Sequence, residues 1–249
     1  MITSQDTYKL FAEYYDKYVR NFSEDLIFYL SRADKNEKII EIGCGTGRIL
    51  EYFLDNGYSI TGVDISNEMI EKSRKKLSAY LKTGNLRILK HDFCVNTISE
   101  KFTLCLITFY TFNYILDNPL QFLKNIYNIL HIKGEIIIDC FYPHTLNQPT
   151  INNKWIEKEF MADGKLIRIK DRRNYSDNIE LRTQVFKENE KTVTIDTQRR
   201  YYSPDELKEL LILAGFKNIQ FSAIYDHLSF SDTIKENAIT RNFVVKAEK

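Results

Sequence analysis

The sequence is poor in the residues that mark disulfide-rich, metal-binding or membrane-spanning proteins. Its 249 residues include four cysteines, four histidines and one tryptophan, and no apolar run approaches the roughly 18 residues of a membrane-spanning helix. The cysteines have no Cys-x-x-Cys spacing and the histidines are dispersed, which argues against a disulfide framework and against a metal site. The N-terminus also lacks the basic and then apolar pattern of a signal peptide. We therefore expect a cytoplasmic protein with no membrane partner and no metal.

Neither sign of charge is in excess, because 35 basic side chains face 34 acidic ones and the net charge is +1. A protein that binds nucleic-acid backbones usually carries a basic surplus or a basic stripe. The composition therefore favours a small-molecule ligand, with no nucleic-acid partner expected. The length allows one large α/β domain with an insertion.

Glycine is also scarce, and three of the nine glycines stand at alternate positions, Gly43, Gly45 and Gly47. An apolar strand ends where this loop begins, and a helical pattern follows from Ile49. Glycines let the backbone approach a ligand closely, and a helix start supplies free amide groups. The spacing differs from the Gly-x-Gly-x-x-Gly of dinucleotide sites, which counts against a nicotinamide-dependent dehydrogenase, and it lacks the Lys-Ser/Thr pair of phosphate loops.

Acidic residues follow the next two predicted strands. Asp64 and Ile65 come directly after the second strand, where a doubly wound fold places a ribose-binding carboxylate, and Asp92 and Phe93 come directly after the third. Each acid alone could equally cap the helix that follows it. The ordered series of glycine loop, acid and acid favours one binding site at a common sheet edge.

The pattern of strands and helices predicts an α/β fold with a doubly wound, mostly parallel sheet of seven strands and an inserted antiparallel β lid. Core strands are expected near 38–42, 58–63, 86–90, 102–109, 134–141, 217–225 and 241–247, and helices at 48–56, 66–82, 118–131 and from Ser203-Pro204 to Ala214. We assign residues 1–149 to N-terminal helices and the cofactor-binding core, 150–202 to the lid, and 203–249 to the segment that completes the core.

The segment Glu41-Ile42-Gly43-Cys44-Gly45-Thr46-Gly47 resembles the first motif of the class I S-adenosylmethionine-dependent methyltransferases, and the chain is similar to their small-molecule subgroup with an antiparallel lid. The likeness extends over nearly the whole chain. It includes an entry helix around Tyr15 and Arg20 and the stretch from Arg200 to Phe216. One departure is Lys101-Phe102 at the start of the fourth strand, where the family often has an acid.

The resemblance implies S-adenosylmethionine as cofactor and methyl transfer to a small polar metabolite, with a nitrogen acceptor favoured over oxygen. Asp64 would accept both ribose hydroxyls while Ile65 covers the adenine, and Asp92 with the Phe93 amide would read the adenine edge. Aromatic faces stabilise a sulfonium as they do other cations. The expected cofactor-binding residues are Tyr15, Arg20, Glu41, Gly43, Cys44, Gly45, Gly47, Asp64, Ile65, Met69, Asp92, Phe93, Phe109 and Tyr114.

Catalytic residues are harder to read from the pattern. Tyr142 and His144 leave the carboxyl end of the fifth strand, the edge at which open α/β sheets bind ligands, and His144 is the candidate general base. An ordinary loop histidine is the alternative, since an amine acceptor can lose its proton to water. In the lid we expect Trp155, Arg199 and Tyr201 to meet the acceptor. Alternation puts Arg199 and Tyr201 on one face with Val193 and Ile195, and that face either lines the pocket or forms the core of the lid.

Two other functions stay open. One is a cofactor-binding regulator or scaffold without catalysis. The other is a nucleic-acid methyltransferase, although the run Thr108-Phe109-Tyr110-Thr111-Phe112-Asn113 stands where an Asn-Pro-Pro-aromatic run would be expected. The acceptor is predicted to be a small molecule, and both a monomer and a homodimer are compatible with the sequence.

Overall fold

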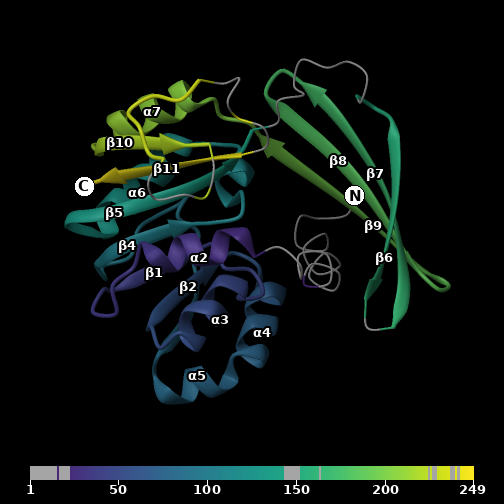
Figure 1. The fold of residues 1–249 in the computed structure, drawn as a ribbon, viewed down its shortest axis with the longest axis horizontal. Helices are drawn as coiled ribbons and strands as arrows, with labels where there is room; N and C mark the ends of the chain where they lie inside the picture. Colours follow the sequence, from purple (N-terminus) through teal and green to yellow (C-terminus); the bar gives the residue numbers. More distant parts are fainter. Residues whose placement is uncertain are drawn as a thin grey trace.

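The structure is a computed structural model, and it describes Asp16 and residues 23–142, 152–162, 164–223, 225, 229–235, 239 and 242–249. A seven-stranded sheet forms one layer, with the strand order β10-β11-β5-β4-β1-β2-β3 (Figure 1). Its strands are β1 (Ile39–Ile42), β2 (Ile60–Asp64), β3 (Leu86–Lys90), β4 (Phe102–Ile107), β5 (Leu130–Phe141), β10 (Lys217–Ser222) and β11 (Asn242–Glu248). Strands β1 to β5 pair in parallel, whereas β11 runs antiparallel to both β5 and β10. The predicted doubly wound, mostly parallel sheet is confirmed.

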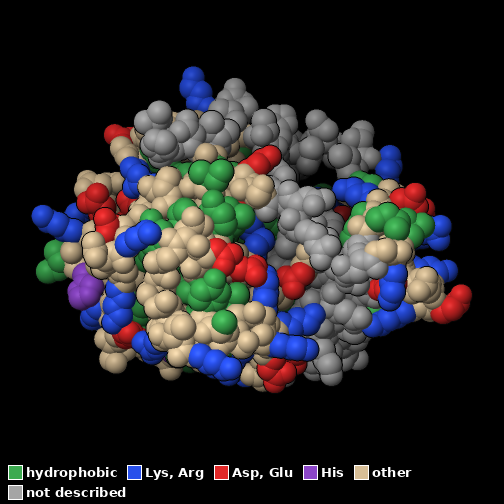
Figure 2. All heavy atoms as spheres, turned by 60° about the horizontal axis from the view of Figure 1, so that its bottom comes forward, with side chains coloured by type: hydrophobic (Ala, Val, Ile, Leu, Met, Phe, Trp, Pro, Cys, Tyr) green, Lys and Arg blue, Asp and Glu red, His purple; other side chains and the backbone are tan. Residues whose placement is uncertain are grey.

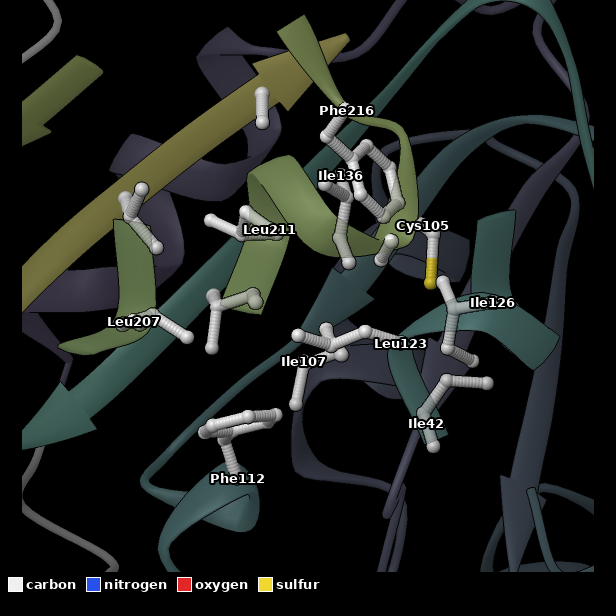
Figure 3. Close-up of a cluster of buried hydrophobic side chains, with 14 of the residues drawn as sticks. Ile42, Cys105, Ile107, Phe112, Leu123, Ile126, Ile136, Leu207, Leu211 and Phe216 are labelled. Carbon is white, nitrogen blue, oxygen red and sulfur yellow. The ribbon is translucent and has the colours of Figure 1, made fainter. Parts of the chain in front are cut away.

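Helices cover both faces of this sheet, so its central strands are apolar on both sides. The helices are α2 (Glu24–Ser31), α3 (Arg48–Asp55), α4 (Asn67–Lys76), α5 (Ser78–Thr83), α6 (Pro119–Ile129) and α7 (Pro204–Ala214), and a short 3-10 helix, η1, spans Thr111–Tyr114. On β4, Cys105 and Ile107 pack toward α6 and α7, whereas Leu104 and Leu106 pack toward α2 and α3. Figure 3 shows the first of these clusters, in which residues of α6 and α7 lie over the strands.

A second sheet of four antiparallel strands, in the order β6-β7-β8-β9, lies beside the first and is drawn in green in Figure 1. Its strands are β6 (Trp155–Ala162), β7 (Lys165–Ser176), β8 (Ile179–Glu188) and β9 (Lys191–Arg200). Tight turns join them, with Gly164, Asp177 and Asn189 at positive φ. One face carries a small core made of Ile167, Ile169, Phe186, Val193 and Ile195. We call this sheet the lid.

Several predicted boundaries need correction. The strand expected over 217–225 ends at Ser222, and the strand expected over 58–63 spans Ile60–Asp64. Strand β4 ends at Ile107 rather than at 109, because Phe109 and Tyr110 turn into the left-handed region. The helix expected over 66–82 is two helices, since Leu77 leaves helical geometry and buries its side chain. Strand β5 begins at Leu130, earlier than expected, because Leu130 already pairs with Phe102 before the register shifts.

The end signals of α7 were correctly read from the sequence. Ser203 caps its first turn, since the Ser203 hydroxyl accepts a hydrogen bond from the Glu206 amide at 3.1 Å. Gly215 ends the helix in the left-handed conformation, at φ 103°. None of the helices in the described part of the chain combines the length and the apolar character that crossing a bilayer requires.

Candidate functional site

A cavity of about 630 Å³ lies between the carboxyl ends of the parallel strands and the lid. The strand order changes direction between β1 and β4, and the crevice at such a point is where open α/β sheets bind ligands. Of the residues predicted from sequence to bind cofactor or acceptor, those that line this cavity are Gly43, Gly45, Asp64, Ile65, Met69, Asp92, Phe93, Phe109, Tyr114 and Arg199. The volume lies within the range of small-molecule sites.

The glycine loop after β1 forms one wall of the cavity. A Cβ atom on Gly43 would stand 2.4 Å from the Thr111 side chain, so this position requires glycine for close packing. Gly45 differs, because a Cβ there would meet nothing within 4 Å, and the residue lines the cavity at a φ of 54°. The loop therefore leaves open backbone toward the cavity at Gly45, where a ligand can contact it directly.

Asp64 is held in place by two backbone amides at the end of β2. Its Oδ2 accepts a hydrogen bond from the Gly45 amide at 2.8 Å, and its Oδ1 accepts one from the Ser66 amide at 2.8 Å. Burial raises the pKa of Asp64 above its ordinary value, although the hydrogen bonds from the backbone amides lower it in part. Each oxygen keeps a second lone pair for a ligand. The helix cap is Ser66, whose hydroxyl accepts from the Met69 amide at 3.3 Å, so Asp64 is not needed for capping.

The end of β3 supplies a second acid and a buried ring. Asp92 is exposed on the cavity wall, and its Oδ1 accepts a hydrogen bond from the Cys94 amide at 2.8 Å. Phe93 is buried, and its carbonyl accepts from the Asn125 amide group at 2.8 Å. Ile65 lines the same cavity with 52% of its surface exposed, which leaves an apolar side chain open to a ligand.

The backbone after β4 adopts an unusual conformation. Phe109 and Tyr110 are consecutive non-glycine residues with φ values of 46° and 66°. Such residues are uncommon and gather at functional sites. The two rings stack with centroids 5.1 Å apart, and the Arg48 guanidinium lies 4.9 Å from the Phe109 ring. Tyr114, at the end of η1, lines the cavity nearer the lid.

Asn113 is a residue whose importance the sequence did not reveal. It is fully buried, and its side chain joins three segments. Its Nδ2 donates to the carbonyl oxygens of Phe141 and Arg200 at 3.0 and 2.7 Å, and its Oδ1 accepts from the Phe141 amide at 2.8 Å. Asn113 thus links the loop after β4 to the end of β5 and to the last residue of the lid. Nothing near Asn113 in the sequence identifies these distant partners.

The lid supplies the opposite wall of the cavity with Lys158, Arg173, Arg182, Thr197 and Arg199. Only Arg199 was predicted. The side chains of Arg173 and Arg182 stand directly opposite each other on β7 and β8, and Arg182 faces Thr197 on β9. The alternation of apolar and charged residues along each lid strand showed that the two faces of the sheet differ. It could not show which of the two faces lies against the core.

Six predicted residues that the structure describes do not line the cavity. The side chain of Glu41 is 1% exposed and turns away from it, because Ile42 takes the position that lines the cavity. Its Oε1 accepts from the Thr108 hydroxyl at 2.7 Å, and its Oε2 has no hydrogen-bond partner among the described residues. Burial raises the pKa of Glu41 to about 8, although the Thr108 hydrogen bond lowers it.

Three more of these residues pack against other parts of the core instead of lining the cavity. They are Cys44, Gly47 and Tyr142. Cys44 is buried in the cluster on the side of α2 and α3. Gly47 is the N-cap of α3, and a Cβ on it would stand 2.6 Å from the Ser73 hydroxyl oxygen. Tyr142 packs against the cluster on the side of α6 and α7. These three positions shape the loop and the strand end rather than the cavity surface.

Trp155 and Tyr201 of the lid are likewise outside the lining. Trp155 is 46% exposed and lies under the Arg172 guanidinium, 4.8 Å away, because strand alternation puts it on the face opposite to Lys158. Tyr201 is buried behind the cavity wall, and its hydroxyl donates to Glu180 at 2.5 Å. Tyr201 therefore positions charged neighbours of the cavity.

Predictions for Tyr15, Arg20 and His144 lie outside the described residues. Asp16 is described, and the Thr46 hydroxyl of the glycine loop donates a hydrogen bond to its carboxylate. Within the described part of the chain, no group of three or more His, Cys, Asp or Glu side chains is arranged to hold a metal ion.

The residues present fit the cofactor that the resemblance implies. Gly45 offers open backbone, and the carboxylate of Asp64 is fixed at the cavity wall with lone pairs to spare. Among the described lining residues, the core contributes two acids and neither Lys nor Arg. A cationic ligand with hydroxyl groups therefore matches this end of the cavity.

Comparison with known proteins agrees with this geometry. A family model described as a methyltransferase domain matches residues 11–221. A malonyl-[acyl-carrier protein] O-methyltransferase from Paenibacillus sp. is 28% identical over 145 residues, which cover 56% of this chain and 51% of that protein. The chain spans only 51 to 59% of the length of the first curated relatives that it matches.

Solved structures match over nearly the full length. An S-adenosylmethionine-dependent methyltransferase from Clostridium acetobutylicum is similar with a TM-score of 0.77 at 20% identity, covering 97% of this chain and 98% of its own. The sugar N-methyltransferase KedS8 from Streptoalloteichus sp. is similar with a TM-score of 0.71 at 12% identity, covering 94% of this chain and 92% of its own. Identities this low indicate a shared fold.

Proposed function

Because the chain belongs to the methyltransferase domain family and has the fold of class I S-adenosylmethionine-dependent methyltransferases, we propose that it methylates a nitrogen atom of a small polar molecule. The observation that carries this proposal is the continuous cavity that joins the glycine loop and both acids to the lid. A cofactor and an acceptor can meet in such a space while both are shielded from water.

In this proposal the core residues hold the cofactor. Open backbone at Gly45 would contact its amino-acid portion, Asp64 would accept hydrogen bonds from the ribose hydroxyls, and Asp92 with Ile65 would hold the adenine. Phe109 and Tyr114 line the same cavity, and their rings would stabilise the positive charge of the cofactor. When bound, the cofactor would supply a methyl group on a sulfonium centre, and the neutral thioether would be a good leaving group as an acceptor lone pair attacks the methyl carbon in line.

The protein then contributes alignment and exclusion of water, which are worth roughly 7–11 kcal/mol when the reacting atoms are well placed. The lid covers the acceptor, and Asn113 fixes the lid to the strand ends through its bonds to Phe141 and Arg200. An amine acceptor attacks through its lone pair and releases its proton to solvent. Because the proton can pass to solvent, the proposed reaction needs no dedicated base. If a base is used, His144 is the candidate.

The choice of nitrogen is supported by the sugar N-methyltransferase, which matches this chain over core and lid together. The O-methyltransferase relative aligns with about half of the chain. Oxygen is therefore the second choice for the acceptor atom. Figure 2 shows Lys and Arg interspersed with Asp and Glu on the face that it draws, and this mixed charge gives a nucleic-acid acceptor no support there.

Calorimetry and product analysis test the proposal together. We expect the protein to bind S-adenosylhomocysteine and not NADH. A screen of small amines and their hydroxyl analogues, with methyl-labelled S-adenosylmethionine, should yield labelled product from an amine. Binding of NADH alone would refute the cofactor, and binding of S-adenosylhomocysteine without product from any acceptor would favour a regulator or scaffold. A His144→Ala variant with turnover within a few-fold of the parent would exclude that residue as base.

A further inference from the structure

The lid wall of the cavity has a concentration of positive charge. Each of the four lid strands places one cation on it, in the order Lys158, Arg173, Arg182 and Arg199. These side chains come from the same face of the sheet, and that face continues into the small apolar core of the lid. The charge is therefore built from four separate strands and not from one basic run.

Two buried carboxylates partly neutralise these cations. Asp171 accepts from Arg182 Nε and Nη2 at 2.8 and 2.7 Å, and from Arg173 Nη2 at 3.2 Å. Burial raises the pKa of Asp171, but the hydrogen bonds and charges of these two arginines together lower it below its ordinary value. Asp171 therefore stays ionised and lies between two arginines that would otherwise repel each other across the strands.

Glu180 is the carboxylate that partly neutralises Arg199. Both Nε and Nη2 of Arg199 donate to Glu180 Oε1, the first at 2.9 Å. The other oxygen, Oε2, accepts from the Tyr201 hydroxyl at 2.5 Å and lies 3.9 Å from Arg173 Nη1. Burial raises the pKa of Glu180, but the charges of Arg199 and Arg173 and the hydrogen bonds from Tyr201 and Arg199 together outweigh burial, so the pKa is lowered and the group is ionised.

In the described part of the chain, the four cations of this wall have two carboxylate partners, which leaves an excess of two positive charges. Among the described residues no acid forms an ion pair with Lys158, and Arg173 Nε is buried without a hydrogen-bond partner. On the outer face of the same sheet, Lys170 has Glu157 at 2.8 Å as its own partner. Lys158 is exposed and Arg173 is half-buried, and Arg173 shares both of its carboxylate partners with other arginines. A bound anion would supply acceptors for the Lys158 ammonium and for the Arg173 guanidinium.

The opposite end of the cavity has the opposite charge, with Asp64 and Asp92 at the strand ends. We propose that the acceptor carries an anionic group, either a carboxylate or a phosphate, and that Lys158, Arg173 and Arg199 bind this group beneath the lid. The inference deepens the methyltransferase function proposed above and rests on it. Guanidinium groups suit both anions, because their paired N–H donors match two oxygens of a carboxylate or phosphate.

This arrangement orients the acceptor. The anion lies against the lid, and the atom to be methylated points toward Phe109, Tyr114 and the strand ends. The two acids at those ends repel an anion, so the reverse orientation is disfavoured. The lid thus selects both the class of acceptor and the direction in which it enters.

The test is calorimetry on the full chain at constant ionic strength, with S-adenosylhomocysteine present. Succinate is the carboxylate probe, inorganic pyrophosphate is the phosphate probe, and chloride is the background anion. We expect one probe to bind. Lys158→Gln and, separately, Arg173→Gln should each weaken that probe about tenfold, as expected for loss of a charged hydrogen-bond donor. Lys187→Gln, on the outer face of β8, is the matched control and should leave the affinity unchanged.

The outcomes separate the possibilities. Binding of succinate alone identifies a carboxylate acceptor, and binding of pyrophosphate alone identifies a phosphate-bearing one. If neither probe binds the parent, or if Lys158→Gln and Lys187→Gln weaken binding equally, the anion site is refuted. The S-adenosylhomocysteine titration is read independently. Its failure would contradict the methyltransferase proposal, whereas its success with no probe binding would contradict only the anion site.

Discussion

Replacement of Glu41 by Gln would test whether β1 holds a protonated carboxyl group behind the glycine loop. The side chain is 1% exposed, Thr108 donates to Oε1 at 2.7 Å, and Oε2 has no hydrogen-bond partner among the described residues. Burial raises the pKa of Glu41 from 4.5 to about 8, so the folded protein keeps this proton at neutral pH. Glutamine has the same size and can still accept from Thr108, but it cannot ionise.

The sign of the effect follows from the raised pKa. Below pH 4.5 the carboxyl is protonated in the folded and the unfolded chain, and its contribution to stability is fully present. Between 4.5 and about 8 the unfolded chain loses the proton while the folded chain keeps it, so stability falls as the pH rises. At about 1.36 kcal/mol per pH unit, the loss over this window is of order 5 kcal/mol.

The assay is urea unfolding followed by circular dichroism at a series of pH values from about 5 to 9. The free energy of unfolding of Glu41→Gln minus that of the parent should rise by several kcal/mol across the range and level off above the folded pKa. Burial raises the pKa of Asp139 to about 7, so Asp139 also makes stability depend on pH. This contribution is the same in the parent and in Glu41→Gln, and it cancels when their free energies of unfolding are subtracted. Glu209→Gln, exposed on α7, is the control and should run parallel to the parent. Parallel curves for Glu41→Gln would refute the reasoning.

Three further substitutions probe the cavity and its support. Asp64→Asn should raise the Kd for S-adenosylhomocysteine about 10- to 100-fold, because a charged hydrogen bond is worth about 1.5–3 kcal/mol; calorimetry showing an unchanged Kd would exclude Asp64 as a ligand. Gly45→Ala should lower the free energy of unfolding by only about 1 kcal/mol, because its φ is 54° and the new Cβ meets no protein atom within 4 Å. The same Cβ would occupy the space in which the ligand contacts the backbone, so the affinity for S-adenosylhomocysteine should fall at least tenfold. A variant that kept full affinity would show that no ligand contacts this backbone. Asn113→Ala should lower the free energy of unfolding by roughly 2–4 kcal/mol through loss of the three hydrogen bonds of this buried side chain, and a loss under 1 kcal/mol in urea titration would contradict its linking role.

The core of the fold was readable from sequence because its signals are local. The glycine loop follows β1, Asp64 is the last residue of β2, and Asp92 is the second residue after β3. In a parallel sheet those strand ends meet at one edge, so sequence order alone predicted a shared site. The cap at Ser203 and the stop at Gly215 are likewise set by residues within one helical turn.

The tertiary structure decided which side chains reach the cavity. Strand alternation identifies two faces but not what covers each, so Glu41 turned out to face away from the ligand space and Lys158, Arg173 and Arg182 to face into it. Asn113 acquires its role from partners 28 and 87 residues away. The sequence by itself determined the fold class and predicted the cofactor end, because both depend on residues that are neighbours along the chain. Only the docking of the lid on the core decided the proposed acceptor end, because its charges converge from four strands that local sequence cannot bring together.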